Sequence, residues 1–416
     1  MFSLFQSRLG APFGKAALQG IVAVASVLAC QRSESRRSSA PVAAVEPSSV
    51  PALRPQVTLT PSAPATASSE VEGPVPRVAP VPSPSTGLQT ALTDADVRSS
   101  HPLPKRRLLF GEQEGRRREA LLREPILRVE RAVGGRSVSY KLTLRGGNQA
   151  LYKPEQSFAA YWFSELASYY LDRALGFVRV PPAVGRRIEW ASLQSDAAAQ
   201  PHLGEVRVGS DGMVRGAMMW WVPERLVPIS PPAGWERCLS VDEPPVVSPF
   251  QRVGDYRRQL AAAAQAAAPA QRSGAAPCGE GAGRLSAERA AELSDLILFD
   301  YLTANHDRWG GQFTNVRTLG VDGPLIAIDN ANGFPPMDRP TGHSEAKLRA
   351  VQRFRAETIR AIEAFDIKQF QQKIERDPLA PLLTRRQLAE LEQRREKLLR
   401  HVRAVRDRVG DAAIPW

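Results

Sequence analysis

The stretch SAERAAELSDLILFDYLTANHDRW, residues 286–309, decides the fold. Ser286 can cap a helix that has Glu288 in its first turn. Apolar residues at helical spacing extend this helix to about Thr303. The helix then delivers Asp307 into a loop, and the candidate chemistry of the chain concentrates around that loop.

The residues after this loop indicate a β-hairpin. After a Gly-Gly turn, residues 315–319 have the pattern of a strand, Asp-Gly at 322–323 makes a hairpin turn, and residues 325–328 form the return strand, which ends at Asp329. A helix, a loop with Asp, a hairpin and a second Asp are the layout of a protein-kinase C-lobe. In phosphoryl transfer, one Asp accepts or orients the proton of the nucleophile, and a second, often with an amide, holds the metal ion on the phosphates. The alternative interpretation is that both Asp residues only form turns.

Upstream, a pair of short strands positions two lysines. Residues 137–144 alternate polar and apolar side chains, a Gly-Gly-Asn turn follows, and residues 149–153 form a short strand. In an antiparallel pair joined this way, Lys141 and Lys153 can converge on one site.

A helix is predicted from about Phe158 to Leu175, with Gly176 as its C-terminal stop. Glu165 lies inside this helix beside bulky apolar residues, and the pattern alone favours a solvent-facing carboxylate. The alternative is an ion pair with a lysine of the preceding strand. Phosphoryl transfer uses such a pair, because a lysine neutralises phosphate charge and a helical carboxylate positions the lysine. The candidate set for phosphoryl transfer is Lys153, Glu165, Asp307, and Asp329 with Asn315.

The middle of the chain adds a core strand and an insertion. Residues 212–223 predict a pair of strands with a heavily apolar second arm. Residues 251–283 are rich in Ala and Pro and indicate a helical insertion with a loose end. Cys238 and Cys278 flank this region. In an exported protein they can form a disulfide that closes about forty residues, and the alternative is two free thiols.

Several of these segments resemble a known family, in the right order over about residues 130–416. The catalytic segment resembles that of the four-jointed kinases, and the Glu165 helix with its following loop is similar to the Golgi casein kinase relatives. The strand lysine motif, the metal-binding segment that replaces Asp-Phe-Gly, and the C-terminal helix also match. The segments are, respectively, residues 294–308, 165–186, 149–154, 329–334 and 391–409. The resemblance implies an α+β, atypical protein-kinase-like bilobal fold, with a β-rich N-lobe over 121–223 and a larger helical C-lobe over 224–416.

The resemblance also implies roles for individual residues. Asp307 is the catalytic base, Asp329 binds Mg²⁺ or Mn²⁺, and Glu165 pairs with Lys153 or reaches the metal. Lys141 joins Lys153 in binding the phosphates of ATP. At the hinge and near the adenine, the implied residues are Trp221, Val222 and Pro223.

Two departures from the family pattern stand out. Four-jointed enzymes carry an Asn five residues after the catalytic Asp, where this chain has Gln312, and Asn315 lies three residues further on. Either amide is therefore a candidate for the metal. The vertebrate relatives also have several disulfides, whereas this chain can form one.

Three neighbours of Asp307 allow two interpretations each. His306 can be a general base, but beside an Asp already placed for that task a packing or loop role is favoured. Arg308 is expected to anchor the loop rather than contact substrate. Trp309 either shapes the acceptor site or covers the loop.

The N-terminal region predicts export and anchoring. Residues 1–30 have the proportions of a signal peptide, and a small residue before Cys30 resembles a bacterial lipoprotein signal, which implies a membrane-anchored lipoprotein in the periplasm or at the cell surface. The alternative is an ordinary anchor or secretory signal in which Cys30 is incidental. Acylation of Cys30 would leave Cys238 and Cys278 as an even pair. Residues 31–120 are expected to form a disordered tether, because a Pro-, Ala- and Ser-rich segment cannot bury enough surface to offset its ordering entropy.

Composition excludes two classes of protein. The chain has 416 residues and a formal charge of +12, which suggests an anionic partner. However, the basic residues are mostly scattered arginines without a stacking-aromatic motif, so nucleic-acid binding is not expected. The clusters at 105–107 and 116–118 are read as solvated charge runs. No run of 18 or more apolar residues exists, which excludes a multi-span membrane protein.

The expected function is transfer of the γ-phosphoryl group of ATP to a hydroxyl of an extracytoplasmic protein (Ser/Thr) or of a glycan. The second hypothesis is a nucleotide-binding pseudokinase that acts as a surface interaction module, since an exported bacterial protein has no obvious supply of ATP. The retained Lys153, Glu165, Asp307 and Asp329 argue against it, because a binding module does not need a proton acceptor.

Overall fold

The computed structural model describes one compact unit of the chain, which lies within Thr90–Trp416. The described residues are 109–111, 113–132, 136–157, 160–194, 202–242, 247–250, 277–279, 281, 283–309, 315–336 and 342–416. The predicted leader 1–30 with Cys30, the tether up to residue 108, most of the insertion at 251–283, and Gln312 lie outside the described residues. None of the helices in the described part combines the length and the apolar character that crossing a bilayer requires.

The N-terminal part is built on a five-stranded sheet in the order β1-β2-β3-β5-β4, with every neighbouring pair antiparallel. Its strands are β1 Ile126–Arg131, β2 Tyr140–Leu144, β3 Gln149–Pro154, β4 Ala183–Glu189 and β5 Met213–Trp220. The predicted hairpin is β2–β3, although β2 is shorter than the predicted strand 137–144. Lys141 is paired with Leu151, and Lys153 lies two residues further along β3, so both lysines are on one face of the sheet.

Residues 212–223 contain one strand, and the predicted pair of strands was wrong. β5 pairs with β3 on one side and with β4 on the other over most of its length. Residues 216–219 of β5 are all buried, so this half of the strand is covered on both faces, which explains its run of apolar residues. The partner β4 was not predicted as a strand. Short helices follow the sheet at α4 Trp190–Gln194 and η1 Leu203–Glu205.

Helix α3, Trp162–Ala174, packs against β4 and β5. It begins four residues later than predicted and ends before Gly176, whose φ of 65° fits the predicted stop. Most of its side chains are buried, and the apolar ones belong to the larger of the two main apolar clusters, which also contains residues of the C-terminal helices. Glu165 is therefore held in a helix that contacts both parts of the fold.

Helix α2, Glu114–Arg123, shows that the folded part begins earlier than predicted, since residues 109–120 were assigned to the tether. It packs against β4 and β5. Arg118 donates to the Tyr170 hydroxyl at 2.8 Å, and Arg173 pairs with Glu114 at 2.6 Å. The interpretation of 116–118 as a solvated run is also wrong for Arg117 and Arg118, which lie over aromatic rings.

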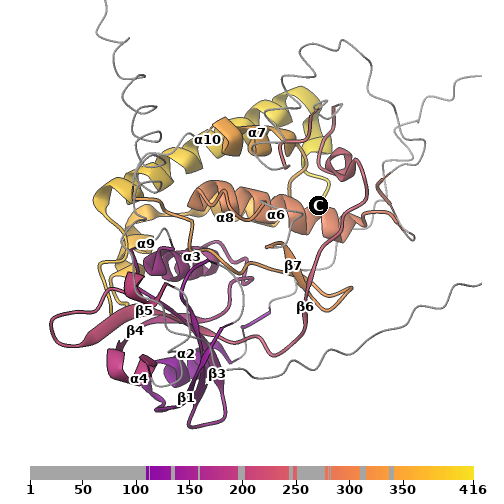
Figure 1. Cartoon of the computed structure of the whole chain (residues 1–416). Helices are drawn as coiled ribbons and strands as arrows, with labels where there is room; N and C mark the ends of the chain where they lie inside the picture. The colour runs from indigo at the N-terminus through magenta and orange to yellow at the C-terminus, as the bar shows by residue number, and fades with distance from the viewer. Residues whose placement is uncertain are drawn as a thin grey trace, which may run out of the picture. The chain divides into compact units, whose positions relative to one another are not determined.

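The C-terminal part is helical around α6, Ala287–Thr303, most of whose side chains are buried. Ser286 caps it as predicted, accepting from the Arg289 N–H at 3.2 Å. The other helices are η2 Trp235–Cys238, α7 Gly342–Ala350, α8 Ala356–Ala364, α9 Ile367–Ile374, α10 Arg385–Val409 and η3 Gly410–Ala413. In Figure 1 the sheet, α2 and α3 form the lower part, and α6, α7, α8 and α10 form the upper part. The predicted α+β fold class is confirmed.

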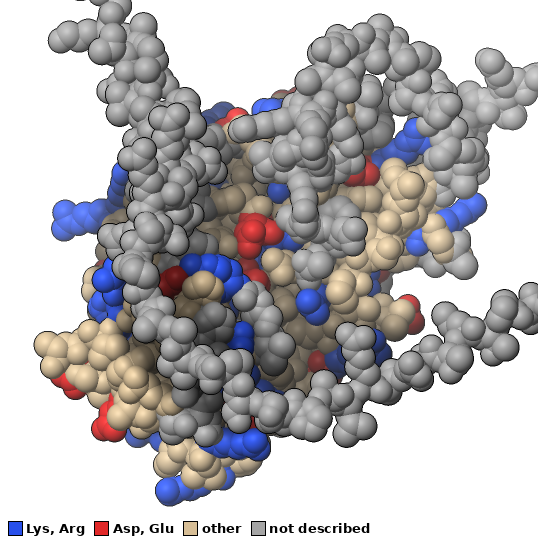
Figure 2. Space-filling view, in the orientation of Figure 1, with Lys and Arg blue, Asp and Glu red and all other residues tan. Residues whose placement is uncertain are grey.

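A small second sheet carries the predicted hairpin. Its strands are β6 Leu226–Pro228, β7 Arg317–Leu319 and β8 Leu325–Ile326, in the order β6-β7-β8. Both hairpin strands are shorter than predicted, and the chain runs on from β8 to Asp329. On the face in Figure 2, Lys and Arg side chains are spread over several elements, so the positive net charge does not form one continuous patch there.

Cys238 and Cys278 form a disulfide, with their Cα atoms 5.5 Å apart and a sequence separation of 40. In the chain-entropy model, a closed loop of that length lowers the entropy of the unfolded chain enough to stabilise the fold by about 3–4 kcal/mol. We expect reduction to lower the free energy of unfolding by that amount, as measured by urea denaturation with and without dithiothreitol. A Cys238→Ala/Cys278→Ala variant should not respond to dithiothreitol, and a wild-type response below about 1 kcal/mol would contradict the prediction.

Candidate active site

The loop with Asp307 starts where helix α6 ends. Ala304 adopts a left-handed conformation, with φ 56°, and this turns the chain out of the helix. The Asp307 side chain is exposed. Its backbone N–H donates to Asn305 Oδ1 at 3.2 Å, and Asn332 Nδ2 donates to Asp307 Oδ2 at 3.1 Å. The carboxylate is therefore oriented by the protein and remains open to a substrate.

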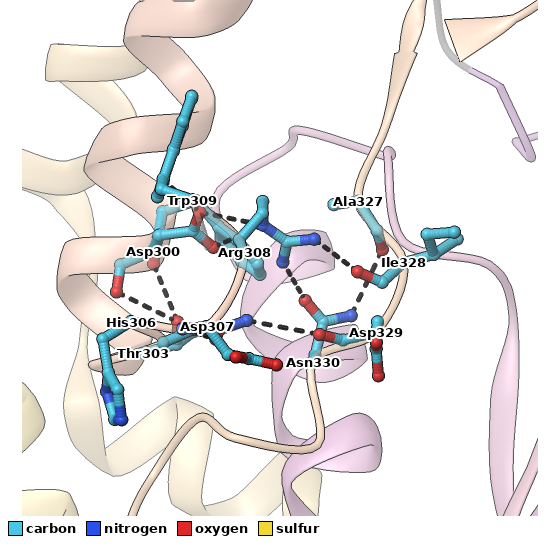
Figure 3. Close-up of polar contacts among 12 residues, drawn as sticks. Asp300, Thr303, His306, Asp307, Arg308, Trp309, Ala327, Ile328, Asp329 and Asn330 are labelled. Atoms are coloured by element: carbon cyan, nitrogen blue, oxygen red, sulfur yellow. Dashed lines mark hydrogen bonds and ion pairs between the residues drawn. The ribbon is translucent and has the colours of Figure 1, made fainter. Parts of the chain in front are cut away.

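Arg308 holds this loop in place, which confirms the anchoring role. Its side chain is fully buried. Its Nε donates to both carboxylate oxygens of Asp300 at 2.8 Å, and its two Nη groups donate to the Ile328 carbonyl and to Asn330 Oδ1 (Figure 3). Burial raises the pKa of Asp300, and attraction to Arg308 opposes that rise. One guanidinium thus ties the end of α6 to the segment that contains Asp329.

The neighbours of Asp307 on either side are structural. Trp309 is buried, stacks on Trp235 with ring centroids 6.1 Å apart, and donates from Nε1 to Asp300 at 3.0 Å. Of its two interpretations, covering the loop is the one that the structure shows. His306 Nδ1 lies 3.1 Å from the Ala304 carbonyl oxygen, which fits the favoured loop role.

Lys153, Glu165 and Asp329 form one ion-paired group. Lys153 Nζ lies 2.5 Å from Glu165 Oε1 and 2.7 Å from Asp329 Oδ1. The other oxygen of Glu165 accepts from the Asn330 backbone N–H at 3.1 Å and from Asn330 Nδ2 at 3.3 Å. The side chain of Glu165 is only 1% exposed, so the solvent-facing interpretation was wrong and the ion-pair alternative holds. A helix buried on most sides leaves a carboxylate no route to water.

Attraction within this group favours the charged form of Lys153 and of Asp329. Burial alone would lower the pKa of Lys153, but attraction from Asp329 and Glu165 outweighs it and raises that pKa. Attraction to Lys153 lowers the pKa of Asp329. The Asp329 side chain is 42% exposed, and its φ of 58° is left-handed, a conformation that costs energy and is often found at functional sites. Lys153 and Asp329 are therefore both charged at neutral pH.

Asparagines that the sequence analysis did not single out connect Asp307 to Asp329. Asn305 accepts from the backbone of Asp307 and donates to the Asp329 carbonyl at 3.4 Å. Asn305, Asn330 and Asn332 thus lie around the site. In Figure 3 the carboxylates of Asp307 and Asp329 extend from the same side of the Arg308 network. The sequence offered one indication of these asparagines, which is how close they lie to the two aspartates. Two Asn lie within three residues of Asp329, and one lies two residues before Asp307.

The remaining predicted residues lie around the chain connection that leaves β5. Lys141 Nζ lies 4.7 Å from the centre of the Trp221 ring, and the Trp221 N–H donates to the Gln149 carbonyl at 3.0 Å. Val222 packs in the apolar cluster of Phe110, Val178 and Ile326. Asn315 makes no hydrogen bond to any described residue.

The donor set around Asp329 suits a hard cation shared with a ligand. Within the described ranges, no three His, Cys, Asp or Glu side chains converge as a complete metal cage. Asp329 engages Lys153 through Oδ1, and its Oδ2 has no hydrogen bond with the described residues. Mg²⁺ is typically held by one or two carboxylates together with phosphate oxygens, and Asp329 can supply one such carboxylate.

Comparison with known proteins finds similarity to one group of kinases. The family model for Golgi casein kinase, C-terminal, Fam20 matches residues 283–413. Four-jointed box protein 1 of Homo sapiens is 29% identical over 267 residues, 56% of this chain and 50% of that protein, so the chain spans about half the length of this relative.

Two solved structures share the fold. The Golgi casein kinase with Mn/ADP bound has a TM-score of 0.52 at 18% identity, covering 72% of this chain and 78% of its own. Hydra Fam20 with sugar has a TM-score of 0.51 at 19% identity, covering 71% and 90%. The family match over the C-terminal part, the curated relative and the shared fold all point in one direction, and the chain is similar to Fam20 and four-jointed proteins.

Proposed function

We propose that the chain is a kinase that transfers the γ-phosphoryl group of ATP to a hydroxyl group. The observation that carries this proposal is the joined arrangement of Lys153, Glu165 and Asp329 on one side of the site and exposed Asp307 on the other. A lysine for phosphate, a carboxylate for a metal ion and a second carboxylate for a proton are the parts that phosphoryl transfer needs. The pseudokinase alternative does not explain why Asp307 is exposed and oriented by a hydrogen bond, because a binding module needs no proton acceptor.

Lys153 binds and neutralises the phosphates in this proposal. Its raised pKa keeps it protonated, and the ion pair with Glu165 positions the ammonium before the nucleotide arrives. Asp329 offers Oδ2 to Mn²⁺ or Mg²⁺, and the ion supplies charge neutralisation on the β- and γ-phosphates when bound. Asn315 and Glu165 remain further candidates for the metal, and one of the matched structures, that of Golgi casein kinase, holds Mn and ADP.

The nucleotide base is assigned to the connection after β5. Trp221 and Val222 follow the central strand directly, and Lys141 lies on the same sheet face as Lys153. We assign the adenine to Trp221 and Val222. Lys141, which now rests against the Trp221 ring, is assigned to the phosphates.

Asp307 receives the proton in the transfer step. The acceptor oxygen forms a bond to the γ-phosphorus while the bond from that phosphorus to the β–γ bridging oxygen breaks, and ADP leaves with the electron pair. The acceptor proton passes to the Asp307 carboxylate, which Asn332 orients. Arg308 keeps the backbone on both sides fixed, so this geometry is preorganised.

The acceptor is a protein Ser/Thr or a glycan, at an extracytoplasmic location. Among the matched structures, one is a casein kinase and another, hydra Fam20, holds a sugar, so both acceptor classes belong in the test. The disulfide Cys238–Cys278 supports export, because disulfides persist in oxidising compartments. A lipid anchor at Cys30 is part of the same proposal.

The test is transfer of labelled phosphate from ATP by the full chain, with Mn²⁺ or Mg²⁺, to casein and to a mixture of glycans. We expect metal-dependent label in one acceptor class, and nucleotide binding by calorimetry that also depends on the metal. Nucleotide binding without transfer to protein, glycan or water would favour the pseudokinase. Absence of nucleotide binding would contradict both.

A further inference from the structure

A buried lysine lies beside the Asp307 loop, outside the set already described. Lys347 belongs to α7, which packs against α6, the helix that ends in this loop. The residue is 5% exposed, yet its ammonium makes no hydrogen bond or ion pair with the described residues. A lysine that is mostly buried and has no ion-pair partner is uncommon, so its position needs an explanation.

Two carboxylates are the electrostatic neighbours of Lys347. Burial lowers the pKa of Lys347 to about 8, and attraction from Asp300 and Asp307 opposes that fall. The amine therefore remains mostly protonated at pH 7. Asp300 already accepts hydrogen bonds from Arg308 and Trp309, and Asp307 is exposed. The positive charge of Lys347 is therefore on the side of the site where Asp307 is proposed to take the acceptor proton, on a helix that packs against α6.

Two cations already described near the aspartates have protein partners, and Lys153 is assigned to the phosphates of the nucleotide rather than to the acceptor side. Lys153 is paired with Glu165 and Asp329, and Arg308 uses its guanidinium on Asp300 and on the segment before Asp329. When the phosphoryl group approaches the acceptor, it also approaches Asp307, whose negative charge repels it. A positive charge on that side would stabilise the transfer, because the transition state spreads negative charge over the equatorial oxygens.

We propose that Lys347 binds the phosphoryl group on the acceptor side of the site as the group passes from ADP to the acceptor hydroxyl. This inference rests on the proposed kinase function. The new bond to phosphorus forms as the bond to the bridging oxygen breaks, the acceptor proton goes to Asp307, and Lys347 keeps its proton throughout. It serves as a fixed charge and takes no part in the proton transfer.

The test compares Lys347→Met with Lys373→Met in the full chain. Lys373 lies on α9 and is exposed, so its variant is a matched control for loss of one lysine. We expect Lys347→Met to lower the rate of phosphoryl transfer to water or acceptor by about 10²-fold, the effect typical of losing one preorganised donor to developing charge. The affinity for Mn²⁺·ADP should stay within about twofold, because ADP lacks the transferred group.

A binding measurement checks the same point without turnover. Beryllium fluoride, a mimic of the transferred group, should bind the wild type loaded with Mn²⁺·ADP at least about tenfold more tightly than it binds Lys347→Met, the loss expected for one charged contact. The melting temperature of Lys347→Met should equal or exceed that of the wild type, because an apolar residue replaces an unpaired buried charge. A lower melting temperature with unchanged beryllium fluoride affinity would show that Lys347 only supports Asp300.

The outcomes separate the two proposals. If Lys347→Met transfers phosphate as fast as the wild type, the proposed role of Lys347 is overturned and the kinase function stands. A wild type that never transfers phosphate overturns the kinase function, and the beryllium fluoride measurement then decides alone whether Lys347 binds a phosphoryl group. If Lys347→Met fails to fold, Lys347→Arg replaces it in the test, because arginine keeps the positive charge. The arginine variant is then compared with Asp329→Asn. If the folded arginine variant binds beryllium fluoride no better than Asp329→Asn does, the inference is also overturned.

Discussion

The Asp307→Asn variant is expected to bind Mn²⁺·ATP as the wild type does and to transfer the phosphoryl group about 10²–10⁴-fold more slowly, the range of general-base catalysis. The amide keeps the size of the side chain and cannot take the acceptor proton. Asp307 is exposed, with one side-chain hydrogen bond, from Asn332, so stability should change little. Single-turnover transfer and calorimetric ATP affinity, measured on the same preparation, separate the chemical step from binding.

Its control is His306→Gln, which changes the neighbouring side chain that the sequence analysis considered as an alternative base. Because the His306 ring lies against the Ala304 carbonyl, this variant should keep its transfer rate within a few-fold. If His306→Gln loses transfer and Asp307→Asn retains it, the base is the histidine. An Asp307→Asn variant with unchanged transfer would exclude the assigned base.

Local signals predicted the elements that carry the two aspartates. The Ser286 cap and the apolar spacing behind it are properties of neighbouring residues, and α6 begins and ends within one residue of the prediction. The hairpin between Asp307 and Asp329 was likewise encoded by its Asp-Gly turn. Such elements depend little on what packs against them later.

The errors occurred where tertiary contacts decide. A solvated run of arginines and an arginine helix lying on aromatic rings look alike in sequence, and only the position of α2 against Tyr169 and Tyr170 tells them apart. Residues 212–223 read as two strands because burial alternates only in the first half of β5 and is continuous in the second half, so the pattern changes within one strand. Glu165 was assigned to solvent by pattern, and its burial depends on Lys153, twelve residues away.

The support of the site was also beyond local reasoning. Asp300 reads as one polar residue in an apolar helix, and its function as the acceptor for Arg308 and Trp309 needs the loop to fold back onto α6. Lys347 was not singled out in the sequence, where it is one of several charged residues in a short polar segment. Its burial becomes visible only when α7 is placed against α6.

The Lys153→Met variant should show the largest combined effect. It leaves the carboxylate of Glu165 buried with hydrogen bonds from Asn330 and no countercharge. Removing one partner of a buried pair typically costs about 3–5 kcal/mol of stability. The same variant removes the phosphate-binding ammonium, so ATP affinity should fall by at least about 10²-fold, as expected for loss of a charge-assisted contact. Urea denaturation and calorimetry measure the two losses separately.

Adding Glu165→Gln to Lys153→Met separates these two losses. The double variant has no uncompensated buried charge, and the remaining partner Asp329 is 42% exposed and can be solvated. Its unfolding free energy should recover to within about 1–2 kcal/mol of the wild type, since replacing a whole buried pair is often close to neutral. ATP binding should stay lost, because stability depends on Glu165 being compensated and binding depends on the ammonium itself. If the double variant is no more stable than Lys153→Met, then Lys153 does not serve as the countercharge of Glu165. If Lys153→Met binds ATP normally, the phosphate site lies elsewhere, and the proposed kinase chemistry loses the group that holds its substrate.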